Sequence, residues 1–285
     1  MSFVGRSQVA IHVADHAPVG APAGPPVVLL HGLLTSGRSW HRLVPSLTRT
    51  RRVIVPDLRG HGQSVASPWD ATLDELVDDM LAVLDALRVD RAALVGLSLG
   101  GLVCLQAALR VPERVDALGL VATPASAETP ESAARRFGTL EAMGRIGARP
   151  VLRGMAGWMF GRSTRRHHPE IVDAWLDEWA AADPAAVCRT ARAALRRSDV
   201  RPWLDCVRAP TLIVVGSEDA VLPREEGESL ARGIPGAALN ELEHAGHLMP
   251  LERPAALGGV LGRWLRTGDG PVGPVEEDDD ARLSA

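Results

Sequence analysis

The sequence contains no lysine and no tyrosine, and it has only three cysteines, Cys104, Cys188 and Cys206, among 285 residues. The cysteines are scattered, odd in number and without metal-ligand spacing, so we expect neither a disulfide framework nor a metal site. Every basic side chain other than histidine is an arginine, and no run of arginines suggests a nucleic-acid or membrane partner. We attach no function to the missing lysine and tyrosine.

Hydrophobic runs of membrane-spanning length are also missing. The opening segment, MSFVGRSQVAIHVADHAP, contains no uninterrupted apolar stretch of the kind found in a secretory signal. We therefore expect a cytoplasmic protein with no membrane partner. Nothing in the sequence indicates the oligomeric state.

Negative charge is concentrated near one end of the chain. Residues 267–285 carry six carboxylates against one arginine, a net charge of −5, whereas the whole chain carries −4. The rest of the chain is therefore close to neutral, as is typical of an ordinary globular protein. The Gly/Pro-rich acidic stretch 267–285 is predicted to be a disordered tail.

Short apolar segments alternate with segments of helical periodicity along most of the chain, which predicts an α/β fold with a mostly parallel, doubly wound sheet. Segments as apolar as 27–30 are typical of strands buried on both faces. The predicted strands are residues 9–13, 27–30, 53–55, 92–95, 115–121, 211–215 and 237–241. The predicted helices are residues 40–47, 72–87, 223–233 and 254–266, with a further helix ending at Arg110.

The strand pattern stops between residues 125 and 206, where the sequence is helical in tendency. We interpret 125–206 as a helical cap inserted into a core formed by residues 1–124 and 207–266, lying over the sheet edge where ligands bind in such folds. Fourteen arginines between Arg135 and Arg208, against nine acids between Glu131 and Asp205, indicate either a solvated surface or a site for an anionic substrate. Trp158, Met159 and Phe160 are candidates for a substrate pocket, although such a cluster is also typical of a cap's own core.

One stretch combines a strand, the pattern Gly96-Leu97-Ser98-Leu99-Gly100 and a helix. This is the sequence form of a nucleophile elbow, in which a serine occupies a sharp strand-to-helix turn. The strained backbone requires small residues two positions before and after the serine, and Gly96 and Gly100 meet that requirement. Gly101 is expected to add slack. Ser98 is therefore the candidate nucleophile.

A serine hydroxyl needs a positioned base, and the base needs an orienting acid. Asp219 follows the strand at 211–215 and is the favoured acid, with Glu218 beside it as the competitor. His247, in the loop after the last strand, is the favoured base, and His244 is the alternative. The order Ser, Asp, His along the chain is the one that folds with a nucleophile elbow use.

Acyl transfer also needs donors for the developing oxyanion. The backbone N–H of Leu99 directly follows the nucleophile and is one candidate. The backbone N–H of Leu33, in the loop after the strand at 27–30, is the other, and Gly32 allows close approach of the backbone there. His31 lies before that glycine, and we expect it to be structural.

The chain resembles the capped enzymes of the α/β-hydrolase fold superfamily. The resemblance runs from Val27 to about Pro254 and rests on HGLLTSGRSW, PDLRGHGQS, VGLSLGGLV, PTLIVVGSEDAVLP and HAGHLMPLERP. It implies Ser98 as nucleophile, Asp219 as acid and His247 as base. Within the superfamily, VPERVDALGLVATPA is similar to the corresponding segment of 3-oxoadipate enol-lactonases.

The predicted function is hydrolysis of a small ester or lactone through an acyl-enzyme on Ser98, without a metal or organic cofactor. Hydrolytic C–C cleavage of a dicarbonyl compound and a cofactor-free, haloperoxidase-like perhydrolase use the same three residues and stay open. A dehalogenase is disfavoured, since that chemistry needs a carboxylate at the position of Ser98. Outside the enzymes, a ligand receptor that retains the fold is the alternative.

Overall fold

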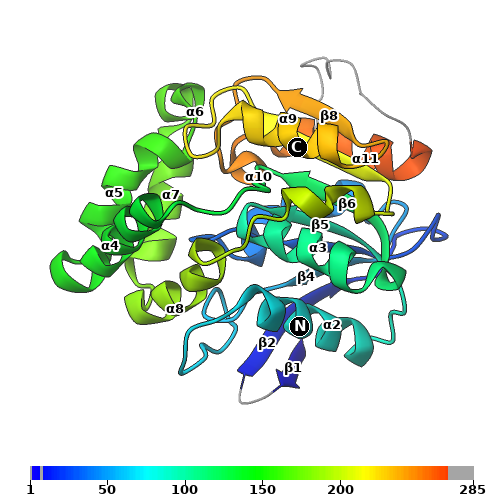
Figure 1. Ribbon diagram of the computed structural model, residues 1–285, viewed down its shortest axis with the longest axis horizontal. Helices are drawn as coiled ribbons and strands as arrows, with labels where there is room; N and C mark the ends of the chain where they lie inside the picture. Colours follow the sequence, from blue (N-terminus) through cyan, green and yellow to red (C-terminus); the bar gives the residue numbers. More distant parts are fainter. Residues whose placement is uncertain (1, 7–8, 269–285) are drawn as a thin grey trace.

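The computed structural model describes residues 2–6 and 9–268. An eight-stranded sheet of order β1-β2-β4-β3-β5-β6-β7-β8 runs through its centre (Figure 1). β2 pairs antiparallel with both β1 and β4, and every other pairing is parallel. The strands are β1 (Ser2–Arg6), β2 (Val9–His16), β3 (Val27–Leu30), β4 (Val53–Pro56), β5 (Ala92–Leu97), β6 (Val115–Val121), β7 (Thr211–Gly216) and β8 (Ala238–Leu242).

The strands β3, β4 and β5 are apolar throughout because both faces of the sheet are covered. In β3, Val27 and Leu29 belong to one buried hydrophobic cluster, and Val28 and Leu30 belong to a second. Helices α1 (Val44–Leu47) and α11 (Pro254–Thr267) contribute to the first cluster. Helices α2 (Leu73–Ala86), α3 (Leu99–Arg110) and α9 (Arg224–Gly233) contribute to the second. The doubly wound arrangement is thereby confirmed.

Polar contacts fix helix α2 and the loop that follows β4. Thr72 and Glu75 form a capping box at the start of α2, so two of its free N–H groups are paired. Farther along α2, Asp79 accepts two hydrogen bonds from the guanidinium of Arg59, at 2.7 and 2.8 Å. Both side chains of this ion pair are about 95% buried. The pair anchors the loop after β4 to the helix.

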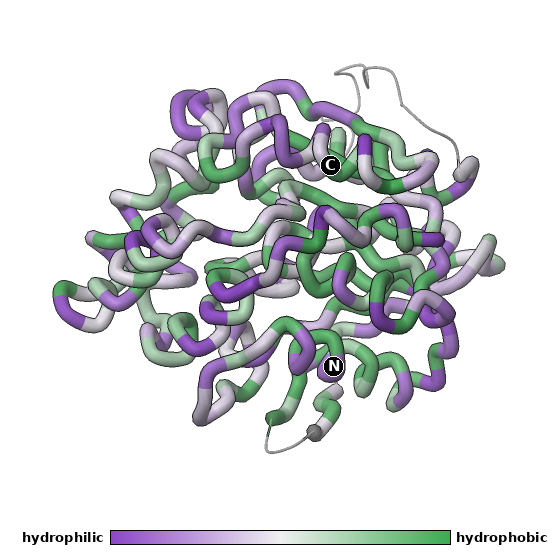
Figure 2. The backbone as a smooth tube through the Cα atoms, viewed as in Figure 1, coloured by the Kyte–Doolittle hydropathy of each residue, from purple (hydrophilic) through white to green (hydrophobic). Residues whose placement is uncertain are grey.

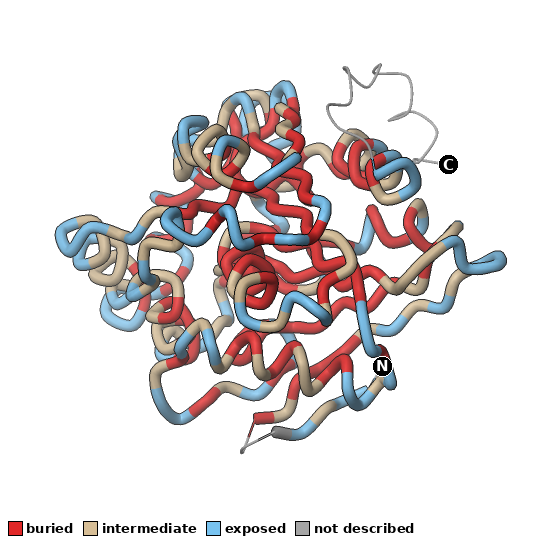
Figure 3. Tube along the Cα trace, turned by 45° about the vertical axis from the view of Figure 1, so that its right-hand side comes forward, coloured by how far each residue is buried: buried red, intermediate tan, exposed pale blue. Residues whose placement is uncertain are grey.

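A helical region is inserted between β6 and β7, as predicted. It consists of α4 (Pro130–Ile146), α5 (Ala148–Met159), α6 (Arg162–His167), α7 (Pro169–Ala180) and α8 (Pro184–Leu195). These helices gather at one side of the molecule, with their outer surfaces exposed (Figures 1 and 3). Inward-facing side chains such as Leu152 and Trp175 join the same buried cluster as β3 and α11. The insertion therefore shares its core with the sheet, and the boundaries 125–206 stay a prediction.

Several elements differ from the expectations. β1 was not predicted, because a five-residue edge strand containing Gly5 lacks a distinctive pattern. The helix expected at residues 40–47 is divided into a 3-10 turn, η1 (Gly37–Trp40), and α1. Two further 3-10 turns, η2 (Pro112–Arg114) and η3 (Arg201–Cys206), and the short α10 (Met249–Glu252) complete the elements. Of the predicted acidic tail at 267–285, residues 269–285 lie outside the described residues.

Hydropathy follows this layering. Hydrophobic segments run through the middle of the molecule, and hydrophilic ones concentrate on its periphery (Figure 2). None of the helices in the described part of the chain has the length and hydrophobicity needed to span a bilayer.

Candidate active site

Ser98 lies at the turn between β5 and α3 with φ 50° and ψ −109°. A non-glycine residue rarely adopts this conformation, which costs about 1–3 kcal/mol. The surrounding hydrogen bonds hold it: the N–H of Ser98 donates to the carbonyl of Val121 at 2.8 Å, and its carbonyl accepts from Leu102 at 2.9 Å. The turn between the two elements is therefore strained and rigid, as the elbow pattern indicated.

The glycines around Ser98 are required by close packing. A Cβ atom added to Gly96 would lie 2.3 Å from the carbonyl of Gly100, and one added to Gly100 would lie 2.3 Å from the carbonyl oxygen of Leu30. Gly101, expected to supply slack, instead packs tightly: its Cβ would fall 1.9 Å from the Thr123 hydroxyl. All three positions exclude a side chain.

His247 and Asp219 meet at the same end of the sheet. His247 Nδ1 lies 2.9 Å from Asp219 Oδ2, and both side chains are at least 95% buried. The other oxygen, Asp219 Oδ1, accepts hydrogen bonds from the N–H groups of Val221 and Leu222 at 2.8 and 3.0 Å. An imidazole that donates through Nδ1 keeps Nε2 as its basic nitrogen.

The surroundings keep Asp219 ionised. Burial alone would raise the pKa of this carboxyl, but the charge of His247 and the hydrogen bonds from His247, Leu222 and Val221 outweigh it. The pKa of Asp219 consequently lies below its ordinary value of 3.8. An ionised carboxylate against Nδ1 stabilises an imidazolium at position 247.

Ser98 and His247 line one cavity of about 400 Å³, within the size range of small-molecule sites. Leu33 and Leu99 line the same cavity. The structure therefore brings the expected nucleophile, base and oxyanion-loop residues together at one hollow. Asp219 lies behind His247, in contact with its Nδ1.

The insertion supplies part of the cavity wall. Trp158 and Met159, two of the three predicted pocket residues, line it. Phe160 differs from the expectation: it is 1% exposed and packs edge-on against Trp175, with 5.4 Å between ring centroids. It belongs to the core behind the lining, because the chain turns between α5 and α6 and directs successive side chains to different sides.

The loop that carries Leu33 is fixed from both sides. Trp175 on α7 donates from its indole nitrogen to the carbonyl of Leu34 at 2.8 Å, and Leu34 has a positive φ of 55°. His31 is fully buried, and its Nε2 accepts a hydrogen bond from the N–H of Leu58 at 2.9 Å. Burial lowers the pKa of His31, so it serves as a neutral link between two loops.

The two competing residues are engaged elsewhere. Glu218 accepts hydrogen bonds from the backbone N–H of Ser163 at 2.8 Å and from its hydroxyl at 2.7 Å, at the start of α6. His244 is more than half exposed and lies 3.8 Å from Glu218. Glu218 thus attaches the loop of Asp219 to the insertion instead of contacting His247.

One functional candidate was not predicted from the sequence. Glu252 is 6% exposed and accepts four hydrogen bonds: from Gly246 N at 3.1 Å, Leu248 N at 3.0 Å, Gly161 N at 2.8 Å and Thr164 Oγ1 at 2.8 Å. Burial raises the pKa of this carboxyl, against the opposing effect of the four donors. Two of these donors flank His247 and two belong to the insertion. A glutamate inside the apolar run LMPLERP was the available sequence signal.

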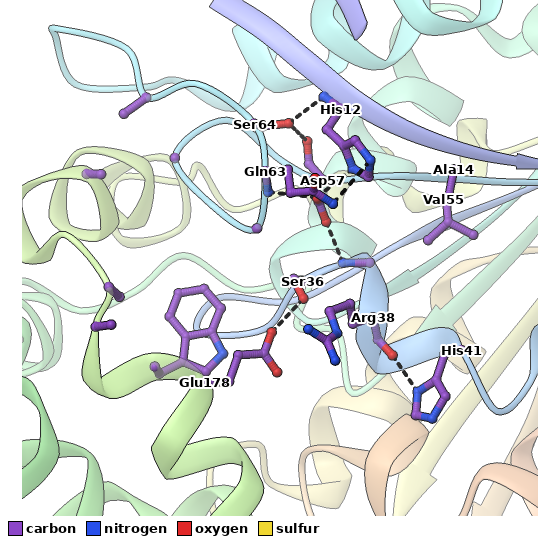
Figure 4. A pocket seen from close by; sticks show the side chains of 18 of the residues that line it. His12, Ala14, Ser36, Arg38, His41, Val55, Asp57, Gln63, Ser64 and Glu178 are labelled. Carbon is purple, nitrogen blue, oxygen red and sulfur yellow. Dashed lines mark hydrogen bonds and ion pairs between the residues drawn. The ribbon is translucent and has the colours of Figure 1, made fainter. Parts of the chain in front are cut away.

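A larger hollow of about 1030 Å³ lies apart from Ser98, between β2, η1 and the end of α7. Figure 4 shows its buried pair of His12 and Asp57, with 2.9 Å between Nδ1 and Oδ2. Ser64 is nearby, but its hydroxyl donates to the carbonyl of Asp57 and accepts from the N–H of His12. Asp57 also accepts from the N–H of Gly37 at 2.7 Å. This network joins three segments of backbone and engages the Ser64 hydroxyl both as donor and as acceptor.

Across residues 2–6 and 9–268, no group of three or more His, Cys, Asp or Glu side chains is arranged to hold a metal ion.

Residues 25–147 match the family described as alpha/beta hydrolase fold. The chain is 31% identical to 2-hydroxymuconate semialdehyde hydrolase from Pseudomonas sp. (strain CF600), over 93% of this chain and 95% of that protein. The chain belongs to the α/β-hydrolase family.

Solved structures agree with this assignment. A thermophilic esterase from Thermogutta terrifontis, solved with malate bound, superposes on this α/β-hydrolase with a TM-score of 0.85 and 32% identity, covering 91% of this chain and 94% of that one. The enol-lactonase from Burkholderia xenovorans LB400 gives a TM-score of 0.84 at 26% identity, covering 93% and 99%. The similarity to enol-lactonases expected from the sequence is therefore confirmed.

Proposed function

We propose that this α/β-hydrolase cleaves a small ester or lactone through an acyl-enzyme formed on Ser98. The observation that carries the proposal is the His247–Asp219 hydrogen bond of 2.9 Å, with His247 and Ser98 at one cavity. The named activities of the esterase and enol-lactonase relatives support the same reaction class.

In the first half of the proposed reaction, His247 Nε2 takes the proton of the Ser98 hydroxyl as its oxygen attacks the carbonyl carbon. The ionised Asp219 holds the imidazole in the tautomer that has Nε2 free and stabilises its charged form. The N–H groups of Leu33 and Leu99 stabilise the negative oxygen, a contribution worth about 100–1000-fold in rate for one such donor.

In the second half, the proton on His247 passes to the departing alkoxide, and the bond to the leaving group breaks. Water then attacks the acyl-enzyme while His247 accepts its proton. His247 returns this proton to the Ser98 oxygen as the acyl bond breaks, which frees the hydroxyl and releases the carboxylic acid. Every step uses side chains and backbone groups of this chain, so the proposed reaction needs no cofactor. Trp158 and Met159 are proposed to contact the substrate.

Hydrolytic C–C cleavage is the second candidate, because the chain is 31% identical to 2-hydroxymuconate semialdehyde hydrolase along nearly its full length. The same nucleophile, base and acid serve that reaction. It differs in that the bond broken joins two carbon atoms, so the leaving group departs with the electron pair on carbon and has to be protonated there.

A substrate panel tests the proposal. Wild type and Ser98→Ala are assayed with short and long 4-nitrophenyl esters, a lactone and a dicarbonyl ring-fission compound. We expect turnover of an ester or the lactone that Ser98→Ala lacks. Turnover of the dicarbonyl compound alone would favour the second candidate, and equal inactivity of both proteins on all substrates would refute both.

A further inference from the structure

The cavity beside Ser98 has an excess of positive charge. Three arginines line it, Arg135, Arg136 and Arg197, and among its described lining residues the only carboxylate is Glu128. Since Glu128 accounts for one charge, the lining carries a net charge of about +2. Three of the many arginines of the insertion therefore lie at the cavity that contains Ser98.

Glu128 is fully engaged by two of these arginines. It lies 2.9 Å from Arg197 and 3.5 Å from Arg136, and its side chain is 8% exposed. Burial opposes ionisation, but the hydrogen bond from Ser132 and the two arginines outweigh it, so the pKa of Glu128 lies below its usual value. The carboxylate is therefore charged and cannot compensate a third cation.

Arg135 is the uncompensated member of the group. Its guanidinium lies 3.4 Å from the hydroxyl of Ser132, and within the described residues no carboxylate lies at ion-pairing distance. Arg136 is bound more firmly, because its Nη2 also donates to the carbonyl of Val221 at 3.3 Å. Val221 in turn donates to Asp219, so the cationic face adjoins the loop of the proposed acid.

The remaining wall is mostly apolar. Its side chains include Leu140, Met155, Leu195 and Leu222. Arg135 is exposed and the side chain of Arg136 is 42% exposed, so both guanidinium groups can be reached by a ligand from solvent. A guanidinium pairs with a carboxylate through two parallel hydrogen bonds. A cavity of this kind fits a molecule with a short hydrocarbon body and an anionic group.

We propose that Arg135 and Arg136 form a subsite for a carboxylate on the substrate. The substrate class is then an ester or lactone that carries a free carboxylate in addition to the acyl group attacked by Ser98. This inference rests on the proposed hydrolase function, and its failure can be told apart from the failure of that function.

Matched substrate pairs test the subsite. Mono(4-nitrophenyl) glutarate and its neutral methyl ester place the charge on the acyl side. 4-Carboxyphenyl acetate and its methyl ester place it on the leaving group. In at least one pair we expect the anionic member to have a kcat/KM about tenfold higher, the effect of one charge-assisted hydrogen bond. The preference should weaken as salt concentration rises.

Variants assign the preference to the residues. Arg135→Gln should remove most of the anionic preference, measured as the ratio of kcat/KM for the anionic ester to kcat/KM for its neutral partner. Arg145→Gln on the same helix is the control, because Arg145 is exposed, pairs with Glu141 and lies away from the cavity lining. It removes the same charge and should leave the anionic preference intact.

Each result decides one question. Ser98-dependent hydrolysis of the neutral esters without anionic preference in either pair would overturn the subsite alone. An equal loss in Arg135→Gln and Arg145→Gln would also overturn it, since the cause would then be overall charge. Absence of any Ser98-dependent hydrolysis would overturn the proposed function, and the subsite with it.

Discussion

Replacing Glu252 by alanine should destabilise the protein strongly. The carboxylate accepts hydrogen bonds from three backbone N–H groups and the Thr164 hydroxyl at 2.8–3.1 Å, in a side chain that is 6% exposed. Each buried donor left unpaired costs about 1–3 kcal/mol. Water entering the vacated space and the released burial cost of the carboxylate offset part of this, so we expect a net loss of about 3–5 kcal/mol.

The loss should be visible both in stability and in catalysis. At about 2–4 °C per kcal/mol for a chain of this size, Tm should fall by roughly 10 °C. Because Gly246 and Leu248 flank His247, kcat should fall more than KM rises, even at temperatures where the variant is folded. Calorimetry and ester kinetics measure the two effects.

Two further variants make the test sharp. Glu243→Ala removes an exposed glutamate from the turn before the same loop and should shift Tm by less than about 2 °C. Glu252→Gln keeps the volume and one accepting oxygen and should be intermediate, which gives a measurable protein if the alanine variant does not fold. If Glu252→Ala melted within 2 °C of wild type, the carboxylate would not be holding the loop.

Three other predictions concern stability. Burial and the nearby His31 lower the pKa of His61 to about 3, so below pH 6.5 the unfolded chain takes up a proton that the folded chain does not. Between pH 7.5 and 5, the unfolding free energy of wild type should therefore fall by about 2 kcal/mol more than that of His61→Gln, as measured by urea denaturation. Equal losses in the two proteins would contradict this. In the same assay, the unfolding free energy of Ser98→Gly should be about 1 kcal/mol higher than that of Ser98→Ala, because glycine tolerates the conformation at φ 50°. Equal unfolding free energies would mean that the backbone at this position is not strained. Asp79→Ala should cost about 3–5 kcal/mol, because it leaves the buried guanidinium of Arg59 without its bidentate partner, and a cost below 1 kcal/mol would show that water replaces it.

Much of the fold followed from local pattern. The strands β3, β5 and β7 are short, mainly apolar runs buried on both faces, and such runs can be identified from the sequence without knowing which elements pack against them. β1 was missed because an edge strand gains its stability from pairing with β2, which leaves little trace in its own residues. The division of residues 37–47 into η1 and α1 likewise depends on contacts that the sequence does not display.

The candidate site could be predicted from the sequence for a different reason. Ser98, Asp219 and His247 each follow a parallel strand, and parallel strands end at one edge of the sheet, so chain order alone indicated that they would meet. The supporting residues were less visible. Glu252 and Trp175 form hydrogen bonds with segments that are far away in the sequence, and the spacing of neighbouring residues does not predict such contacts.

The most direct test of the account is the labelling of Ser98 by a fluorophosphonate, followed by mass spectrometry of the intact protein and of its peptides. The account predicts one adduct per chain, on the peptide containing Ser98, with labelling lost in Ser98→Ala and strongly slowed in His247→Ala. Equal labelling of wild type and Ser98→Ala, or an adduct on another serine such as Ser64, would contradict it.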